Sequence, residues 1–266
     1  MRKNTIKEIW ARGEAVINGW CSIPSSFSAE IMAHQGFDSI TIDTQHGLVD
    51  YQMATTMLQA ISTTEVIPLT RVPWKDPGTL MKMLDAGSYG VIVPMVNTVE
   101  DAELVVGACK YPPRGYRSFG PIRAKYYGGG NAHGGGVYHN FADEETLVIV
   151  QIETREAIKN LDEILQVPGL GAIYIGPSDL SMALGKEPRK GQTDPEVLEA
   201  KAYILETAKK HGVPAGLHTN STEVALDSIK QGFQFISIQS DDRFLMGKAK
   251  EEVGNVRSGI EKLKGA

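Results

Sequence analysis

The chain has 266 residues, of which 42% are hydrophobic and 22% are charged, and it carries a formal net charge of −5. No window approaches the roughly 18 consecutive apolar residues of a membrane span, and Lys and Arg do not cluster as a nucleic-acid backbone would require. We therefore expect a soluble protein with a small-molecule partner and with neither a membrane nor a nucleic acid as partner.

The first ten residues are basic, but Glu8 interrupts them and they lack the apolar stretch of a secretory signal, so a cytoplasmic location is expected. Cys21 and Cys109 are the only two cysteines, too few for a disulfide framework, and they form no C-x-x-C pair. Both are expected to be buried thiols in a reducing compartment.

Eight short β-branched apolar runs recur along the chain, and segments with helical periodicity separate them. We predict strands at residues 15–22, 38–43, 66–71, 90–94, 146–152, 171–175, 213–217 and 235–239. An open doubly wound sheet would also alternate in this way. Eight comparable units in a chain near the roughly 250 residues of a (β/α)8 TIM barrel favour closure into one α/β domain over residues 1–266, with a helical tail from about residue 241.

Local signals mark the ends of the intervening helices. Polar caps and prolines predict helix starts at Ser26, Asp76-Pro77, Thr98 and Asp194-Pro195. Gly87, Gly212 and Gly232 each follow a helical segment, as C-terminal caps do.

The connection between Pro94 and Thr146 is longer than the others. It contains a predicted helix, then Tyr111-Pro-Pro-Arg-Gly-Tyr-Arg117, then a glycine-rich run from Gly128 to Gly136. Long loops are usually functional lids or mobile linkers, and the sequence leaves both open. The run is no phosphate-binding loop, because it lacks the Lys-Ser/Thr ending.

Polar residues follow four of the predicted strands, at the carboxyl ends where TIM barrels place their active sites. These segments are Asp43-Thr-Gln-His-Gly47, Arg71-Val-Pro-Trp74, Gln151-Ile-Glu-Thr154 and Gly176-Pro-Ser-Asp-Leu180. Together they would supply an acid–base group, a cation and two carboxylates at one mouth of the barrel.

Glu153 and Asp179 are the candidate metal ligands, because two carboxylates with open positions suit Mg²⁺ or Mn²⁺. Co²⁺ is a further candidate, whereas zinc usually takes His and Cys ligands that are missing here. The alternative is that one of the two carboxylates pairs with an arginine.

Arg71 ends an apolar strand, where its guanidinium needs an anionic substrate or an internal carboxylate such as Asp43 or Glu153. His46 follows Asp43 by three residues, so the carboxylate is expected to orient the ring for proton transfer. His218 is a further, less favoured candidate for lining the pocket. No predicted strand ends in a lysine, which argues against a Schiff-base mechanism and leaves metal stabilisation of an enolate.

These strand ends resemble those of the HpcH/HpaI family of metal-dependent pyruvate aldolases, typified by 4-hydroxy-2-oxoheptanedioate aldolase. The resemblance runs along nearly the whole chain. It rests on Ala29-Glu30, Gly36-Phe-Asp38, Asp43 with His46-Gly47, Arg71-Val-Pro73, Val93-Pro-Met95, Tyr111–Arg117, Gln151–Glu156 and Gly176–Leu180.

The resemblance implies that Glu153 and Asp179 ligate the metal, and that Arg71, Gln151 and the backbone amides of Ser178 and Asp179 hold a 2-oxo acid. It implies that His46, supported by Asp43, moves the proton. The implied reaction is reversible cleavage of a 4-hydroxy-2-oxo acid to pyruvate, or a related 2-oxo acid, and an aldehyde. Decarboxylation of a 2-oxo acid, lysis of an acyl-CoA ester and a non-catalytic carboxylate-binding barrel are the alternatives.

The resemblance also implies a homohexamer in which a C-terminal helix packs on a neighbouring subunit. The tail from Asp241 to Leu263 could be this helix, although the plainer interpretation is that it closes its own barrel. Two features depart from the family pattern. Gln45 stands where members commonly have Glu, and the glycine-rich run at 128–136 looks longer than usual. The first departure bears on metal preference, and both bear on the choice of acceptor.

Overall fold

The computed structural model describes residues 2–128, 135–188 and 193–264. Eight parallel strands close into a barrel in the order of the sequence. They are β1 (Val16–Cys21), β2 (Ser39–Asp43), β3 (Ile67–Arg71), β4 (Gly90–Val93), β5 (Leu147–Gln151), β6 (Ala172–Ile175), β7 (Ala215–Thr219) and β8 (Phe235–Ile238). Each predicted strand overlaps one of them, so the prediction of a (β/α)8 TIM barrel is confirmed.

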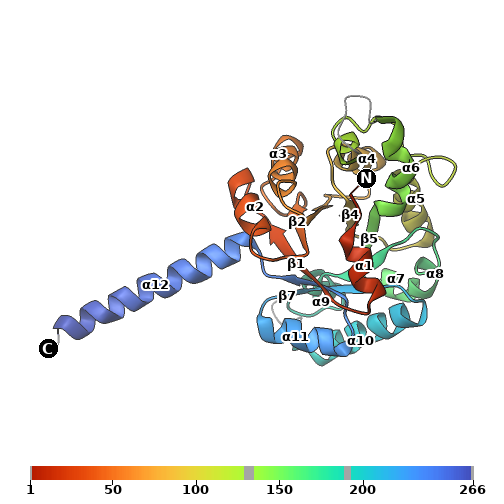
Figure 1. The fold of residues 1–266 in the computed structure, drawn as a ribbon. Coiled ribbons are helices and arrows are strands. Elements are labelled where there is room, and N and C mark those ends of the chain that lie inside the picture. The colour runs from red at the N-terminus through yellow and green to blue at the C-terminus, as the bar shows by residue number, and fades with distance from the viewer. Residues whose placement is uncertain (1, 129–134, 189–192, 265–266) are drawn as a thin grey trace.

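Helices surround the barrel, except α12, which extends away from it (Figure 1). They are α1 (Thr5–Ala11), α2 (Ser26–Ala33), α3 (Tyr51–Ile61), α4 (Pro77–Asp85), α5 (Val99–Cys109), the 3-10 turn η1 (Ala124–Gly128), α6 (Gly135–Glu145), α7 (Arg155–Lys159), α8 (Leu161–Ile164), α9 (Pro177–Ala183), α10 (Pro195–Lys210), α11 (Thr222–Gln231) and α12 (Asp241–Lys264). The predicted caps at Asp76, Thr98 and Asp194 each accept a hydrogen bond from a backbone N–H of the first helical turn.

The strands are apolar because they are buried on both faces, as expected for a parallel sheet covered by helices. Alternate residues form an outer core against the helices and an inner core that fills the barrel, with Trp20, Ile149, Tyr174 and Phe235 in the inner core. Asn18 adds a polar layer inside the barrel by bonding Ser39, Thr41 and Ser237. Side chains therefore fill the barrel, and its mouth is the place for a site.

The long connection between β4 and β5 contains α5, η1 and α6. The sequence predicted only the first of these helices, and it also missed α1. Residues 129–134 of the glycine-rich run lie outside the described residues.

Helix α12 extends away from the barrel (Figure 1), and Asp241 is its only buried residue. The Asp241 carboxylate accepts hydrogen bonds from the Ser22 amide and the Ser28 hydroxyl, both at 2.8 Å, which fixes the start of the helix to the barrel. Apolar side chains along the rest of the helix are exposed, including Val253 and Leu263. The interpretation of the tail as a helix that closes its own barrel is therefore wrong.

Cys21 and Cys109 are buried free thiols, as predicted. In the described ranges, none of the helices combines the length and the apolar character that crossing a membrane requires.

Candidate active site

Asp43 and Arg71 are the last residues of the neighbouring strands β2 and β3, and the strand register pairs them directly. Arg71 donates from Nε to Asp43 Oδ1 at 2.9 Å and from Nη2 to Asp43 Oδ2 at 2.6 Å. This is one of the internal salt bridges that the sequence left open. Burial alone would raise the pKa of Asp43, but the hydrogen bonds and charge of Arg71 lower it below its ordinary value.

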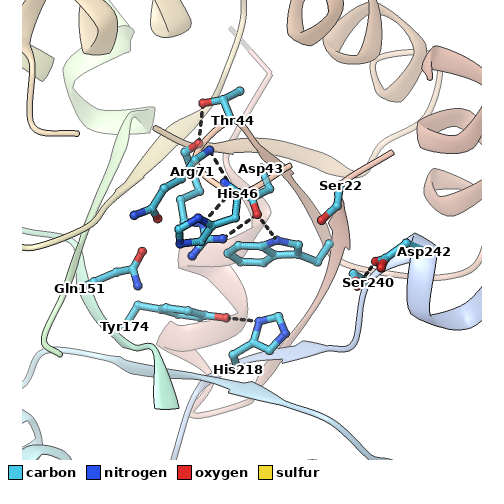
Figure 2. Close-up of polar contacts among 12 residues, drawn as sticks. Ser22, Asp43, Thr44, His46, Arg71, Gln151, Tyr174, His218, Ser240 and Asp242 are labelled. Atoms are coloured by element: carbon cyan, nitrogen blue, oxygen red, sulfur yellow. Dashed lines mark hydrogen bonds and ion pairs between the residues drawn. The ribbon is translucent and has the colours of Figure 1, made fainter. Parts of the chain in front are cut away.

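The Asp43 carboxylate also organises the turn that follows β2. It accepts hydrogen bonds from the backbone N–H groups of Gln45 at 3.0 Å and His46 at 3.2 Å, and from Trp20 Nε1 at 3.2 Å. Asp43 thus contacts His46 through its backbone, which differs from the expected contact with the imidazole ring. The side chain of His46 is exposed, and it lines the same cavity as Arg71 (both are labelled in Figure 2).

Glu153 lies two residues beyond the end of β5, and its side chain is held at both oxygens. Oε1 accepts the Met95 backbone N–H at 3.0 Å, and Oε2 accepts Gln151 Nε2 at 2.7 Å. Met95 adopts a left-handed backbone with φ of 56°, which is unusual for a residue with a side chain and common at functional sites. Burial, together with the nearby charge of Asp179, raises the pKa of Glu153 to about 7.

Asp179 lies in the first turn of α9 and approaches Glu153 across Gly176. A Cβ atom built on Gly176 would lie 2.7 Å from Glu153 Oε2 and 3.7 Å from Asp179 Oδ2. The two carboxylates therefore flank a space that only a glycine leaves open. Like charges at such a separation favour a cation between them.

The donor set around Gly176 fits a divalent metal. Gln151 Oε1 is buried beside Glu153 without a hydrogen-bond partner, and Asp179 is exposed to the mouth. Among the described residues, no group of three His, Cys, Asp or Glu side chains is placed to hold an ion. Two carboxylates with the remaining positions left to water and substrate are what Mg²⁺ and Mn²⁺ accept, whereas structural zinc takes four protein ligands.

A cavity of about 190 Å³ opens at this end of the barrel. Its polar lining side chains are His46, Arg71, Gln151, Tyr174, Ser178, Asp179 and His218, and Gly176 and Pro177 complete the wall. The structure thus brings candidate residues of all four strand ends together, and Glu153 adjoins them through its hydrogen bond to Gln151. No lysine is among the lining residues in the part of the chain that the structure describes.

Two aromatic residues of this region were not predicted as site residues. Trp20 stacks on Tyr174 with ring centroids 5.9 Å apart, and the Arg71 guanidinium lies 4.8 Å from the Trp20 ring. Tyr174 in turn hydrogen-bonds His218 Nδ1 at 3.1 Å. Both aromatic residues lie inside predicted strands, so only the inward or outward direction of each strand position could have identified them.

Comparison with known proteins places the chain in a family. The family description HpcH/HpaI aldolase/citrate lyase matches residues 20–246. A hydroxypyruvate/pyruvate aldolase of Rhizorhabdus wittichii is 36% identical over 96% of this chain and 99% of its own length. A 4-hydroxy-2-oxo-heptane-1,7-dioate aldolase of Klebsiella pneumoniae is 34% identical over 91% of this chain and 89% of its own length.

The fold comparison agrees. The crystal structure of an HpcH/HpaI aldolase/citrate lyase family protein from Burkholderia cenocepacia J2315 superposes with a TM-score of 0.86 at 28% identity. The superposition covers 96% of this chain and 100% of the other. The chain therefore belongs to the HpcH/HpaI aldolase/citrate lyase family of carbon–carbon lyases.

Proposed function

We propose that the chain is a divalent-metal-dependent aldolase that reversibly cleaves a 4-hydroxy-2-oxo acid to pyruvate, or a related 2-oxo acid, and an aldehyde. The observation that carries the proposal is the pair of carboxylates, Glu153 and Asp179, that flanks Gly176 beside a cavity lined by Asp179, Arg71 and His46. The names of the curated relatives, which are aldolases of pyruvate and of a 4-hydroxy-2-oxo acid, support the same reaction.

Glu153 and Asp179 would hold the metal, with Mg²⁺, Mn²⁺ and Co²⁺ as candidates. When bound, such a cation supplies Lewis acidity toward the oxygens of a 2-oxo acid and so favours the enolate. Gln151 keeps Glu153 oriented through the 2.7 Å hydrogen bond to Oε2. This role is typical of residues that surround a metal ligand.

Arg71 would bind the oxygen of the donor on which negative charge develops. Asp43 engages Nε and one N–H of Nη2, so Nη1 and the second N–H of Nη2 can donate to the substrate. Because Asp43 fixes the guanidinium in place, the donor needs no reorganisation when charge develops. The backbone amides of Ser178 and Asp179, at the start of α9, would bind the donor carboxylate.

His46 would move the proton. Its side chain is exposed at the cavity mouth, where it can accept a proton from the methyl carbon of the donor or deliver one to the aldehyde oxygen, directly or through water. Asp43 supports this role by holding the backbone of the turn rather than the ring.

The alternatives use the same site. A 2-oxo acid decarboxylase would make the same enolate by losing carbon dioxide, and an acyl-CoA lyase would release it from a thioester. A non-catalytic carboxylate-binding barrel would need the cavity only for affinity. We favour the aldolase because the site combines a base and a cation in the cavity with two carboxylates beside Gly176.

The test uses pyruvate alone, because an enzyme that forms the enolate exchanges the methyl protons of pyruvate with solvent even without an aldehyde. In deuterium oxide, the NMR methyl signal should fade with Mg²⁺ or Mn²⁺ and persist with chelator. His46→Ala should slow the loss, whereas His34→Ala, which changes an exposed histidine outside the cavity, should not.

Exchange that survives complete removal of metal would contradict the proposal. So would a pyruvyl adduct on a lysine after borohydride treatment, because the imine route needs a lysine at the site. Absence of exchange with every metal tested would favour the binding-protein alternative.

We also propose that the protein is a cytoplasmic homohexamer in which α12 packs on a neighbouring subunit. The exposed apolar side chains of α12 at Met246, Val253, Val256, Ile260 and Leu263 support a partner for this helix. Successive members lie seven, three, four and three residues apart, a spacing that places them on one face of the helix.

A further inference from the structure

His218 is a wall residue of the cavity that has no part in the proposed handling of the donor. It comes from β7, and its Nδ1 hydrogen-bonds the hydroxyl of Tyr174, which comes from β6, at 3.1 Å. In Figure 2 these two side chains lie below Arg71 and His46, across the site from the turn that follows β2. The cavity therefore has a second polar wall besides the one that binds the donor.

The ring of His218 is held in place on two sides. Besides its bond to Tyr174, it packs edge-on against Trp20 with ring centroids 5.1 Å apart, and Trp20 itself stacks on Tyr174. Trp20 is further fixed by its hydrogen bond to Asp43. An imidazole held in this way presents a preorganised hydrogen-bonding group to whatever occupies the cavity.

Burial, and then the charge of Arg71, lower the pKa of His218 to about 4, so the imidazole is neutral near neutral pH. A neutral imidazole suits a hydroxyl group, to which it can donate or from which it can accept a hydrogen bond. Among the described residues, Arg71 is the one lysine or arginine that lines the cavity, and Asp43 already engages it. This wall therefore favours an uncharged, hydroxylated group over a carboxylate.

The size of the cavity also limits the occupant. Its volume of about 190 Å³ corresponds to about six water molecules at roughly 30 Å³ each. A three-carbon donor and a short acceptor fill this space. Seven of the nine lining residues carry a polar side chain, so an acceptor in the cavity has hydrogen-bonding groups around it.

We propose that the acceptor is a short, uncharged hydroxyaldehyde, and that His218, held by Tyr174 and Trp20, selects it by hydrogen-bonding its hydroxyl group. This inference rests on the proposed aldolase function. With glycolaldehyde, one proton leaves the pyruvate methyl carbon and that carbon bonds the aldehyde carbon. The carbonyl π electrons move to the aldehyde oxygen, which takes up a proton, and the product is 4,5-dihydroxy-2-oxopentanoate.

The test compares glycolaldehyde with propanal, in which a methyl group of similar size replaces the hydroxyl. Both aldehydes react with the same enolate, so the ratio of their kcat/KM values cancels any effect on the donor. Because glycolaldehyde and propanal differ in intrinsic reactivity, the ratios of the variants are compared with that of the wild-type protein. For one hydrogen bond in a buried site we expect His218→Leu to lower the ratio about tenfold.

His218→Gln, which keeps a hydrogen-bonding group, should recover the ratio to within about threefold of the wild-type value. His34→Leu, the same change at an exposed histidine outside the cavity, should leave the ratio unchanged. A wild-type protein that prefers propanal would overturn the inference. A His218→Leu variant that keeps the wild-type ratio of kcat/KM values would also overturn it. If His218→Leu does not fold, the His218→Gln variant decides: a ratio about tenfold below the wild-type value would overturn the inference.

The exchange of pyruvate methyl protons separates the two proposals. Wild-type protein that exchanges the protons but shows no His218-dependent selection of the hydroxyaldehyde would disprove the inference and leave the aldolase function standing. Wild-type protein that neither exchanges the protons nor joins either aldehyde to pyruvate would disprove both.

Discussion

A single methyl group at Gly176 should weaken the metal site while leaving the barrel folded. The Cβ of an alanine there would lie 2.7 Å from Glu153 Oε2, closer than real Cβ contacts come, and a tight 3.1 Å from Gln151 Nε2. Gly176 has φ of −88° and ψ of 101°, which alanine adopts without strain. The steric effect therefore falls on Glu153, whose carboxylate must shift by several tenths of an ångström and lose its fit to Met95 or Gln151.

The size of the effect follows from what such contacts contribute. Loss of the groups that orient a metal ligand costs about 10–100-fold in metal affinity. At a metal concentration that saturates both proteins, a tenfold loss lowers the metal-dependent stabilisation by about 1.4 kcal/mol. For a chain of this size, 1 kcal/mol corresponds to roughly 2–4 °C. The rise in Tm on adding Mn²⁺ should therefore be about 3–5 °C smaller in Gly176→Ala than in the wild-type protein.

The assay measures thermal unfolding with and without Mn²⁺, together with calorimetric titration of the metal. Each variant is compared with its own metal-free form, which removes the cost of overpacking. Gly254→Ala is the matched control, because a Cβ there meets nothing within 4 Å and the residue lies on exposed α12. Wild-type Mn²⁺ affinity in Gly176→Ala would show that the carboxylates beside this glycine do not hold the metal.

Sequence reasoning located the strands and the candidate site residues because short stretches of sequence determine both. A strand buried on two faces must be apolar, and the residues that follow β2, β3, β5 and β6 are polar because they leave the core at the barrel mouth. Gln151 and Glu153 are an example, since they lie two positions apart and their side chains therefore meet on the same side of the segment. Barrel closure then brings such segments together without any further signal.

Contacts between strands could not be predicted in the same way. The partner of Arg71 depends on the β2–β3 register, which pairs it with Asp43 and leaves Glu153 to Met95 and Gln151. His218 lines the cavity, as sequence reasoning suggested, but its contacts with Tyr174 and Trp20, which come from other strands, could not be foreseen. The direction of α12 depends on how Asp241 is anchored, and helical periodicity says nothing about that.

Three further predictions concern charge, assembly and pH. Arg71→Ala should lower turnover by about 10²–10³-fold. The same change leaves the Asp43 carboxylate buried without its ion-pair partner and so lowers stability; adding Asp43→Asn should restore the stability but not the turnover. Truncation after Ser240 should lower the assembly state measured by light scattering, and an unchanged oligomer would count against helix exchange. The pH prediction rests on Glu153, whose pKa of about 7 lies above its ordinary value of 4.5. Because burial disfavours the ionised carboxylate, the metal-free protein should lose stability as pH rises from about 4.5 through 7. The metal needs that ionised form, so the rise in Tm on adding Mg²⁺ should grow between about pH 5.5 and 8. Glu153→Gln should abolish both pH trends. A Mg²⁺-dependent rise in Tm of the wild-type protein that is equal at about pH 5.5 and pH 8 would show that Glu153 is not the titrating ligand.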